Sequence, residues 1–317
     1  MTTDTALDLL VQRATWEARD VLGVDLVHPD GEQLPPWQPG AHIDLTLPSG
    51  TIRQYSLCGD PADRARYRIG ILREQNGRGG SLEAHTTALV GRVLRVNGPR
   101  NRFPLVAAGR YLFIAGGIGI TPILAMLRVV TAPWSLIYGG RSLSAMAYQN
   151  EIVALSGGQV TLVPQDTDGL PELDAIIATA DADTAVYCCG PEGLLREVER
   201  LCAAKLPPGA LHVERFAAPA DVPGDDAEDG PFEVELRRSG LTLTVPADTS
   251  VLQAVLEHLP DLSYSCQEGY CGTCETRVLA GTPLHRDTVL SDAEREAGDT
   301  MMICVSRSRT PLLTLDL

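Results

Sequence analysis

The 317-residue chain lacks several features that would point to a membrane, to nucleic acid or to secretion. Basic residues are fewer than acidic ones, 26 against 41, and the net charge of −15 disfavours nucleic acid and anionic membranes as partners. The longest apolar stretch, residues 111–127, is interrupted by Gly116, Gly117, Gly119 and Pro122 and is too broken to span a bilayer. A positively charged protein partner is favoured instead.

A secretory signal is also missing, because residues 1–5 provide neither a basic start nor an apolar stretch. Eight cysteines are present, and the four that lie outside the pattern described below, Cys58, Cys188, Cys189 and Cys202, show no disulfide framework, which suits a reducing compartment. We therefore expect a cytoplasmic monomer that binds neither nucleic acid nor membrane. At 44% hydrophobic and 21% charged residues, the chain has an ordinary globular composition and room for two or three domains.

Four of the cysteines form a metal-binding pattern. Cys266, Cys271 and Cys274 follow the spacing C-x4-C-x2-C, and Cys304 follows after 29 intervening residues. This is the plant-type spacing for a 2Fe-2S cluster, in which one tight loop supplies three thiolates and a separate element supplies the fourth. Alternatives are a structural zinc site, disulfides or scattered buried cysteines. Zinc sites usually pair a C-x2-C with a second one or with histidines, and this chain has a single C-x2-C.

Residues 1–103 contain short alternating runs separated by Gly, Pro and Asp turns, which predicts an antiparallel β-barrel of about six strands. The runs are residues 22–27, 42–47, 51–57, 67–73 and 91–96. One of them carries Arg53, Tyr55 and Ser56, a guanidinium, an aromatic ring and a hydroxyl that together suit a phosphorylated flat ring. An amphipathic edge strand would explain the same residues.

A glycine-rich turn, Asn76 to Ser81, precedes a helical stretch. Backbone N–H groups of such a turn can cradle a phosphate. The alternative is a flexible turn in which Ser81 caps the helix.

Residues 104–217 alternate between strand and helix patterns, which predicts an open parallel sheet with helices on both faces. Ligands of such sheets bind at the carboxyl ends of the strands, where Gly116–Pro122 and Cys189–Glu192 fall. The first turn would allow a pyrophosphate to approach the backbone, and the second would allow a flat ring to lie against it. These glycines could also serve turn geometry alone.

Residues 218–231 are acidic, rich in Pro and Gly, and read as an interdomain linker. Residues 232–317 predict a β-grasp, with strands wrapped on a helix that Ser250 is expected to cap. Acidic residues outnumber basic ones in this region. They form either a solvated surface or a docking face for a basic electron acceptor.

Taken in order, these motifs resemble the phthalate dioxygenase reductase family, which includes vanillate O-demethylase reductase subunits. They are also similar to the reductase part of self-sufficient haem-thiolate monooxygenases. The resemblance covers nearly the whole chain. It implies an FMN-binding barrel over 1–103, an NAD(P)H-binding domain over 104–217 and a 2Fe-2S ferredoxin domain over 232–317.

The resemblance also implies the roles of individual residues. Ser56, Thr121 and Cys189 would act at the site of hydride transfer, with Ser56 near flavin N5 and Thr121 between flavin and nicotinamide. The implied contacts of FMN and the nicotinamide cofactor are Arg53, Gln54, Tyr55, Ser56, Ile71, Gly77, Arg78, Gly79, Gly80, Ser81, Gly117, Thr121, Arg141, Ser142, Cys189, Gly190, Pro191 and Phe216. Cys266, Cys271, Cys274 and Cys304 would hold the cluster.

The implied function is an oxidoreductase that passes electrons from NAD(P)H through FMN and the cluster to a Rieske-type oxygenase or demethylase. A haem-thiolate monooxygenase as acceptor and a non-enzymatic iron–sulfur redox sensor are the alternatives. The donor is expected to be NADH, although Arg141 and Ser142 could hold the 2′-phosphate of NADPH.

Overall fold

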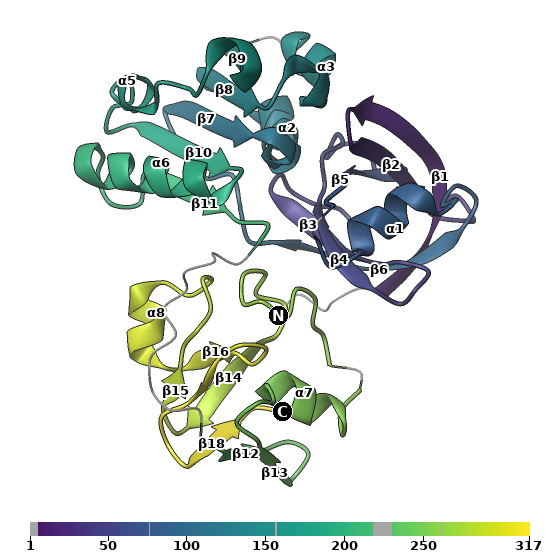
Figure 1. Ribbon diagram of the computed structural model, residues 1–317, viewed down its shortest axis with the longest axis vertical. Helices are drawn as coiled ribbons and strands as arrows, with labels where there is room; N and C mark the ends of the chain where they lie inside the picture. The colour runs from purple at the N-terminus through teal and green to yellow at the C-terminus, as the bar shows by residue number, and fades with distance from the viewer. Residues whose placement is uncertain (1–5, 76, 156, 218–229, 261) are drawn as a thin grey trace. The chain divides into compact units, whose positions relative to one another are not determined.

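The structure is a computed structural model that describes residues 6–75, 77–155, 157–217, 230–260 and 262–317 (Figure 1). It divides into two units, Met1–Arg215 and Phe216–Leu317. Most of the predicted linker, residues 218–229, lies outside the described residues, as does Asn76 of the glycine-rich turn. The two units are described in turn.

The first unit begins with a six-stranded antiparallel barrel. Its strands are β1 (Ala6–Ala18), β2 (Val21–Val27), β3 (Ala41–Thr46), β4 (Ile52–Ser56), β5 (Arg66–Leu72) and β6 (Val93–Asn101). They are ordered β4-β3-β6-β1-β2-β5, and a bridge between Leu57 and Ile69 joins the two edges. Alternating side chains such as Leu9, Ile43 and Tyr67 fill the interior, as the period of a half-buried strand requires. Helix α1 (Gly80–Thr86) follows β5.

The longest barrel strand, β1, is the one that the sequence pattern does not single out. Its burial does not alternate regularly, and the pairing with β2 is shifted between Val11 and Arg13 and again between Trp16 and Ala18. Bulges of this kind insert an extra residue and break the period of two on which strand recognition depends.

A five-stranded parallel sheet completes the first unit. Its strands are β7 (Arg110–Gly116), β8 (Trp134–Gly140), β9 (Gly158–Pro164), β10 (Thr184–Cys189) and β11 (Leu211–Glu214), in the order β11-β10-β7-β8-β9. The helical elements are η1 (Gly117–Gly119), α2 (Ile120–Val129), η2 (Leu143–Ala145), α3 (Gln149–Val153), α4 (Gln165–Asp168), α5 (Leu173–Ile177) and α6 (Glu192–Lys205).

Both faces of this sheet are covered, as a parallel sheet requires. On one face, Phe113 and Tyr138 pack in one core with Leu124 of α2. On the other, Ile114 and Val186 pack in a separate core with residues of α6. Successive residues of β7 thus point to opposite faces, and both are apolar.

The second unit is built on a five-stranded mixed sheet. Its strands are β12 (Phe232–Leu236), β13 (Leu241–Val245), β14 (Glu275–Ala280), β16 (Thr300–Met302) and β18 (Leu312–Leu315), in the order β13-β12-β18-β14-β16. β15 (Pro283–Leu284) and β17 (Arg307–Ser308) form a separate small pair, and the helices are α7 (Val251–Leu256) and α8 (Asp292–Ala297).

Helix α7 covers this sheet through Val251, Leu252 and Val255, which share one core with Val234 and Leu313. Its N-cap is Ser250, as predicted, and Ser250 and Gln253 form a reciprocal capping box. The predicted fold class is therefore confirmed: an antiparallel barrel, a parallel α/β sheet and a β-grasp unit. Among the described residues, no helix combines the length and apolar character needed to cross a membrane.

Candidate functional site

Arg53 ties strand β4 to the glycine-rich turn. Its guanidinium donates to the carbonyl oxygen of Arg78 at 2.9 Å and to that of Ile52 at 2.7 Å. A methyl group at Gly80 would lie 2.7 Å from Arg53 Nε and 2.8 Å from its Cγ. Gly80 therefore leaves the space that the Arg53 side chain fills, and two segments predicted to bind the same phosphorylated ring meet at this contact.

The turn itself has the geometry of an open cradle. Gly79 has a φ of 82°, a left-handed conformation that suits glycine, and it is the N-cap of α1. Ser81 is therefore not the cap, and that reading is wrong: its hydroxyl instead accepts from the Glu74 amide at 3.0 Å. With the Arg53 side chain beside it, the turn fits a phosphate group.

Tyr55 and Gln54 lie on either face of β4, and Ile71 lies in β5. Burial raises the pKa of the Tyr55 phenol, while the Arg53 charge opposes the rise, so the ring remains neutral at physiological pH. The Gln54 amide donates to Asp44 at 3.4 Å. Ile71 is fully buried, and its carbonyl oxygen lies 2.9 Å from Nε2 of His85 in α1.

Ser56 meets a carboxyl group that the sequence reading did not include. Ser56 is the last residue of β4, and its hydroxyl donates to Glu214 Oε2 at 3.4 Å. Burial raises the pKa of Glu214 to about 8, and the Ser56 hydrogen bond only partly offsets this. Glu214 ends β11, where it pairs with Cys189 at the end of β10. Ser56, Glu214 and Cys189 thus meet at the carboxyl edge of the parallel sheet.

Nothing in the local sequence marks Glu214 as special. It stands in a short strand, Leu211–Glu214, among the 41 acidic residues of the chain, and it lies 158 positions from Ser56. One feature could have identified Glu214 as a site residue: it is the last residue of a parallel strand, and ligands of such sheets bind at the carboxyl ends of the strands.

The two predicted nucleotide turns lie in direct backbone contact. A methyl group at Gly119 would lie 2.2 Å from the Cys189 carbonyl oxygen, and one at Gly190 would lie 2.9 Å from Gly116 Cα. A methyl group at Gly116 would in turn lie 2.6 Å from Cδ of Pro191. These glycines therefore allow the two turns to pack closely against each other.

Gly117 has a φ of 54°, which suits glycine, and a methyl group there would meet nothing within 4 Å. Thr121 lies in the first turn of α2 and is 2% exposed, with its hydroxyl donating to the Ile118 carbonyl oxygen at 3.0 Å. Cys189 is fully buried, and burial raises the pKa of its thiol well above the ordinary value, with the Glu214 charge adding to the rise. The Cys189 side chain is therefore a neutral thiol.

Arg141 and Ser142 follow β8, at the same carboxyl edge of the sheet. The Ser142 hydroxyl lies 3.0 Å from that of Ser144, and the Arg141 carbonyl oxygen accepts from the Asp166 amide at 3.1 Å. Phe216 begins the second unit and is 38% exposed.

The four predicted cluster cysteines come together in the second unit. They are buried, between 4% and 7% exposed, and all are free thiols. Interactions of the Cys266 thiol with Cys271 and Cys304, and of Cys304 with Cys274, join the set. The neighbouring Cys266 thiol and then burial raise the pKa of the Cys271 thiol. The shift is expected when several thiols lie close together in a buried site without a metal to stabilise the thiolates.

The loop supplies N–H groups to these sulfurs. Glu268 donates its amide to Cys266 Sγ at 3.3 Å, and Thr273 donates to Cys271 Sγ at 3.5 Å. Gly269 and Gly272 both have a φ of 74°, so the loop turns through conformations that favour glycine. Bonds of this kind stabilise thiolates around an iron centre.

The described part of the chain contains no three His, Cys, Asp or Glu side chains in position to share a single metal ion. A 2Fe-2S cluster makes a different demand, because its four thiolates are shared between two irons. The linked set of four cysteines and the amides aimed at it fit that cluster.

Comparison with known proteins identifies the family to which the chain belongs. Residues 234–309 match the family described as the 2Fe-2S iron-sulfur cluster binding domain. The chain is 46% identical to the phenoxybenzoate dioxygenase subunit beta of Ectopseudomonas oleovorans, over 98% of this chain and 97% of that protein. It is 41% identical to the vanillate O-demethylase oxidoreductase of Pseudomonas putida, over 98% and 100% of the two chains.

Among solved structures, phthalate dioxygenase reductase matches with a TM-score of 0.71 and 34% identity over 98% of both chains. The chain belongs to the phthalate dioxygenase reductase family. An intact type IV self-sufficient cytochrome P450 monooxygenase matches with a TM-score of 0.88 and 41% identity. That match covers 98% of this reductase but 41% of the monooxygenase, so the reductase spans less than half of that longer chain.

The predicted function class and cofactors are thereby confirmed. The reductase is an NAD(P)H-dependent oxidoreductase that passes electrons through FMN and a 2Fe-2S cluster to a partner oxygenase. The redox-sensor alternative is not supported, because the relatives are reductase components of oxygenase systems.

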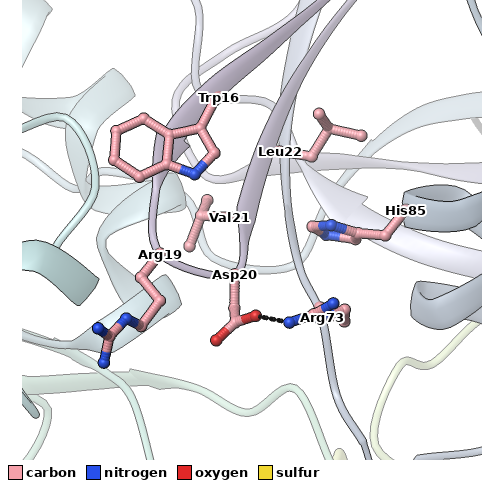
Figure 2. Close-up of a pocket in the computed structure, with 7 residues that line it drawn as sticks. All are labelled: Trp16, Arg19, Asp20, Val21, Leu22, Arg73 and His85. Carbon is pink, nitrogen blue, oxygen red and sulfur yellow. Dashed lines mark hydrogen bonds and ion pairs between the residues drawn. The ribbon is translucent and has the colours of Figure 1, made fainter.

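Figure 2 shows a pocket beside the turn between β1 and β2. Asp20 and Arg73 form an ion pair there, and Trp16 is 73% exposed. The lining residues are Trp16, Arg19, Asp20, Val21, Leu22, Arg73 and His85. None of them belongs to the predicted cofactor contacts, so this pocket is separate in its residues from the site of the reductase.

Proposed function

We propose that the reductase performs hydride transfer at the meeting point of Ser56, Glu214 and Cys189, and serves a Rieske-type oxygenase. The observation that carries the first part is the contact of Ser56 with Glu214, which joins a barrel strand to the carboxyl edge of the parallel sheet. The residue predicted to lie near the flavin thereby meets the edge predicted to hold the nicotinamide.

When bound, FMN accepts a hydride from the reduced nicotinamide and releases electrons singly, and the cluster carries them one at a time. The protein supplies position. Arg53 and the turn over Gly77, Arg78, Gly79, Gly80 and Ser81 hold the phosphate of the flavin, while Gln54, Tyr55 and Ile71 border its ring. Gly117, Thr121, Gly190 and Pro191 shape the nicotinamide side, and the family resemblance assigns Phe216 as an aromatic residue near the flavin. Arg141 and Ser142 contact the adenosine half.

Glu214 holds a proton at neutral pH, because burial raises its pKa to about 8. Protonated, it would present an uncharged carboxyl group to the bound cofactors. Its contact with the Ser56 hydroxyl also fixes the orientation of that side chain. We infer that Glu214 is a positioning residue that orients Ser56, and that Ser56, Thr121 and Cys189 act at the site of hydride transfer.

A Rieske-type acceptor is supported by the relatives that share nearly the full length of this chain. They are named as parts of dioxygenase, demethylase and monooxygenase systems. The second candidate, a haem-thiolate monooxygenase, is favoured by the structural match with the self-sufficient cytochrome P450, in which a chain segment of this fold is part of the oxygenase polypeptide.

Reconstitution tests the acceptor. The purified reductase, NADH and a purified Rieske oxygenase should give substrate turnover, and a haem-thiolate oxygenase should give none. The reverse result would overturn the assignment. A Cys271→Ser variant, which lacks one predicted cluster ligand, is the control. Electron transfer from this variant to the oxygenase would show that electrons can bypass the cluster. Repeating the assay with NADPH tests our preference for NADH.

Helix α8 offers a docking surface for that acceptor. Asp292, Glu294 and Glu296 are exposed along it. We propose that a basic patch of the oxygenase binds there, which predicts faster cytochrome c reduction at low salt than at high salt.

We further propose that the reductase is a cytoplasmic monomer with NADH as its donor. Sedimentation should give a single species of 34.0 kDa.

A further inference from the structure

Gly70 is one of the points at which the barrel contacts the turn over Gly116–Pro122. It lies in the middle of β5, paired with Gly23 of β2. A methyl group at this position would lie 2.7 Å from the Tyr148 hydroxyl oxygen, 2.9 Å from Thr121 Cγ2 and 3.4 Å from Ile118 Cδ1. Side chains from η1 and α2 thus leave no room for a methyl group at this position of β5.

Tyr148 is fixed in this contact from several sides. It is 4% exposed, and its φ of 61° lies in the left-handed region, which a non-glycine residue adopts at a cost of about 1–2 kcal/mol. The Arg68 guanidinium lies over its ring, 4.8 Å from the centroid, and Cys58 Sγ lies 3.8 Å from its hydroxyl oxygen. A strained backbone held by so many contacts indicates a position that the fold specifies.

Arg68 is itself anchored by both halves of the unit. It donates to Glu17 of β1 at 2.9 Å and to Glu151 of α3 at 2.8 Å. Arg128 of α2 also pairs with Glu151. The ion pairs therefore connect barrel strands with two helices of the parallel sheet, and they surround the aromatic ring that contacts Gly70.

The neighbours of this contact belong to the proposed site. Ile71, next to Gly70, is a predicted flavin contact, and Thr121 is predicted to lie between flavin and nicotinamide. Hydride transfer needs reacting atoms about 3–3.5 Å apart, and a misplacement of about 1 Å can cost roughly 100-fold in rate. A spacer between β5 and Thr121 therefore controls the reaction distance.

We propose that Gly70 and Tyr148 form a positioning pair that sets the spacing between strand β5 and the Thr121 turn. This inference rests on the proposed site of hydride transfer. The pair acts through geometry and touches neither reacting atom. The space that glycine leaves at position 70 is filled by the tyrosine hydroxyl, so the two residues are matched in size.

The matching predicts a rescue. Gly70→Ala forces the turn away from the barrel, because the new methyl group overlaps the hydroxyl of Tyr148 and the methyl of Thr121. Tyr148→Phe removes the hydroxyl, so the closest of these overlaps disappears in the double variant. In stopped-flow experiments, Gly70→Ala should slow flavin reduction by NADH about tenfold and raise the deuterium isotope effect. Tyr148→Phe alone should slow flavin reduction by about threefold, less than Gly70→Ala does. The double variant should be faster than Gly70→Ala but slower than the parent, because the overlap with the Thr121 methyl group remains.

Two further readouts separate positioning from general damage. Flavin content should be unchanged in all variants. The thermal midpoint of the flavin-free protein should show the same coupling: Gly70→Ala should lower it, and adding Tyr148→Phe should recover part of that loss. Gly193→Ala is the matched control, because a methyl group there meets nothing within 4 Å.

Parent-like flavin reduction in Gly70→Ala, or a double variant as slow as the single one, would overturn the positioning pair while leaving the site intact. Failure of the parent protein to reduce its flavin with NADH or NADPH would instead remove the proposed function itself.

Discussion

Replacing Glu214 by Gln should flatten the pH dependence of the stability of the first unit. The cause is the burial of this carboxyl group beside Ser56, which raises its pKa from 4.5 to about 8. The folded protein therefore keeps a proton that the unfolded chain releases in mildly acidic solution. A glutamine has a similar shape, can still accept from Ser56 and does not ionise.

The sign and size follow from proton linkage. The stabilising effect of holding this proton is fully present below about pH 4.5 and declines as pH rises toward the folded-state pKa of about 8. One proton corresponds to about 1.4 kcal/mol per pH unit. Between pH 6 and pH 8 the parent should therefore lose about 2 kcal/mol of unfolding free energy relative to Glu214→Gln.

Urea unfolding followed by flavin fluorescence at pH 6 and pH 8 measures this difference. Glu172→Gln provides the matched control, since Glu172 is exposed and the same charge is removed. Equal pH slopes for the parent and Glu214→Gln would refute the argument, because they would mean that Glu214 titrates alike in the folded and unfolded chains.

Three further substitutions test the site. Gly80→Ala should displace the Arg53 side chain, which lies 2.7 Å from the added methyl group, and weaken FMN binding about tenfold by fluorescence titration. Cys271→Ser should abolish cytochrome c reduction yet preserve reduction of a dye that takes electrons from flavin; surviving cytochrome c reduction would contradict the order of the relay. Gly119→Ala should lower the stability of the first unit by about 2–3 kcal/mol, seen as an earlier thermal midpoint, because backbone of Cys189 stands in the way. An unchanged midpoint would mean that the two turns separate freely.

The features of this protein that could be predicted are those that depend on residues close together in the sequence. Cys266, Cys271 and Cys274 lie within one loop, so their spacing alone indicates the cluster, and only Cys304 comes from elsewhere. The parallel sheet was predictable for a similar reason, since buried strands such as β7 and β10 are continuous apolar runs that alternate with helical stretches along the chain. The bulged strand β1 was not, because its burial follows no period.

Contacts between distant segments could not be read in this way. Glu214 is recognised as a site residue only through its hydrogen bond with Ser56, which lies 158 positions away in the sequence. That contact depends on how the barrel packs against the sheet. Gly70 looks like an ordinary glycine in an alternating strand until Tyr148 and Thr121 are placed against it. A pattern of residue types identifies an element, but complementary shapes between elements appear only after folding.

The two ends of the relay are therefore specified in different ways, and they should respond differently to mutation. The cluster depends on a short loop whose amides and thiols lie a few residues apart, so damage there should be local and should leave flavin reduction intact. The hydride-transfer site depends on matched surfaces of two folded layers, with Gly70, Gly119 and Glu214 at their contacts. Because interiors are close-packed, one added methyl group at such a contact shifts a whole layer. Substitutions at the barrel–sheet junction should thus reduce hydride transfer more than substitutions at exposed positions close to the flavin.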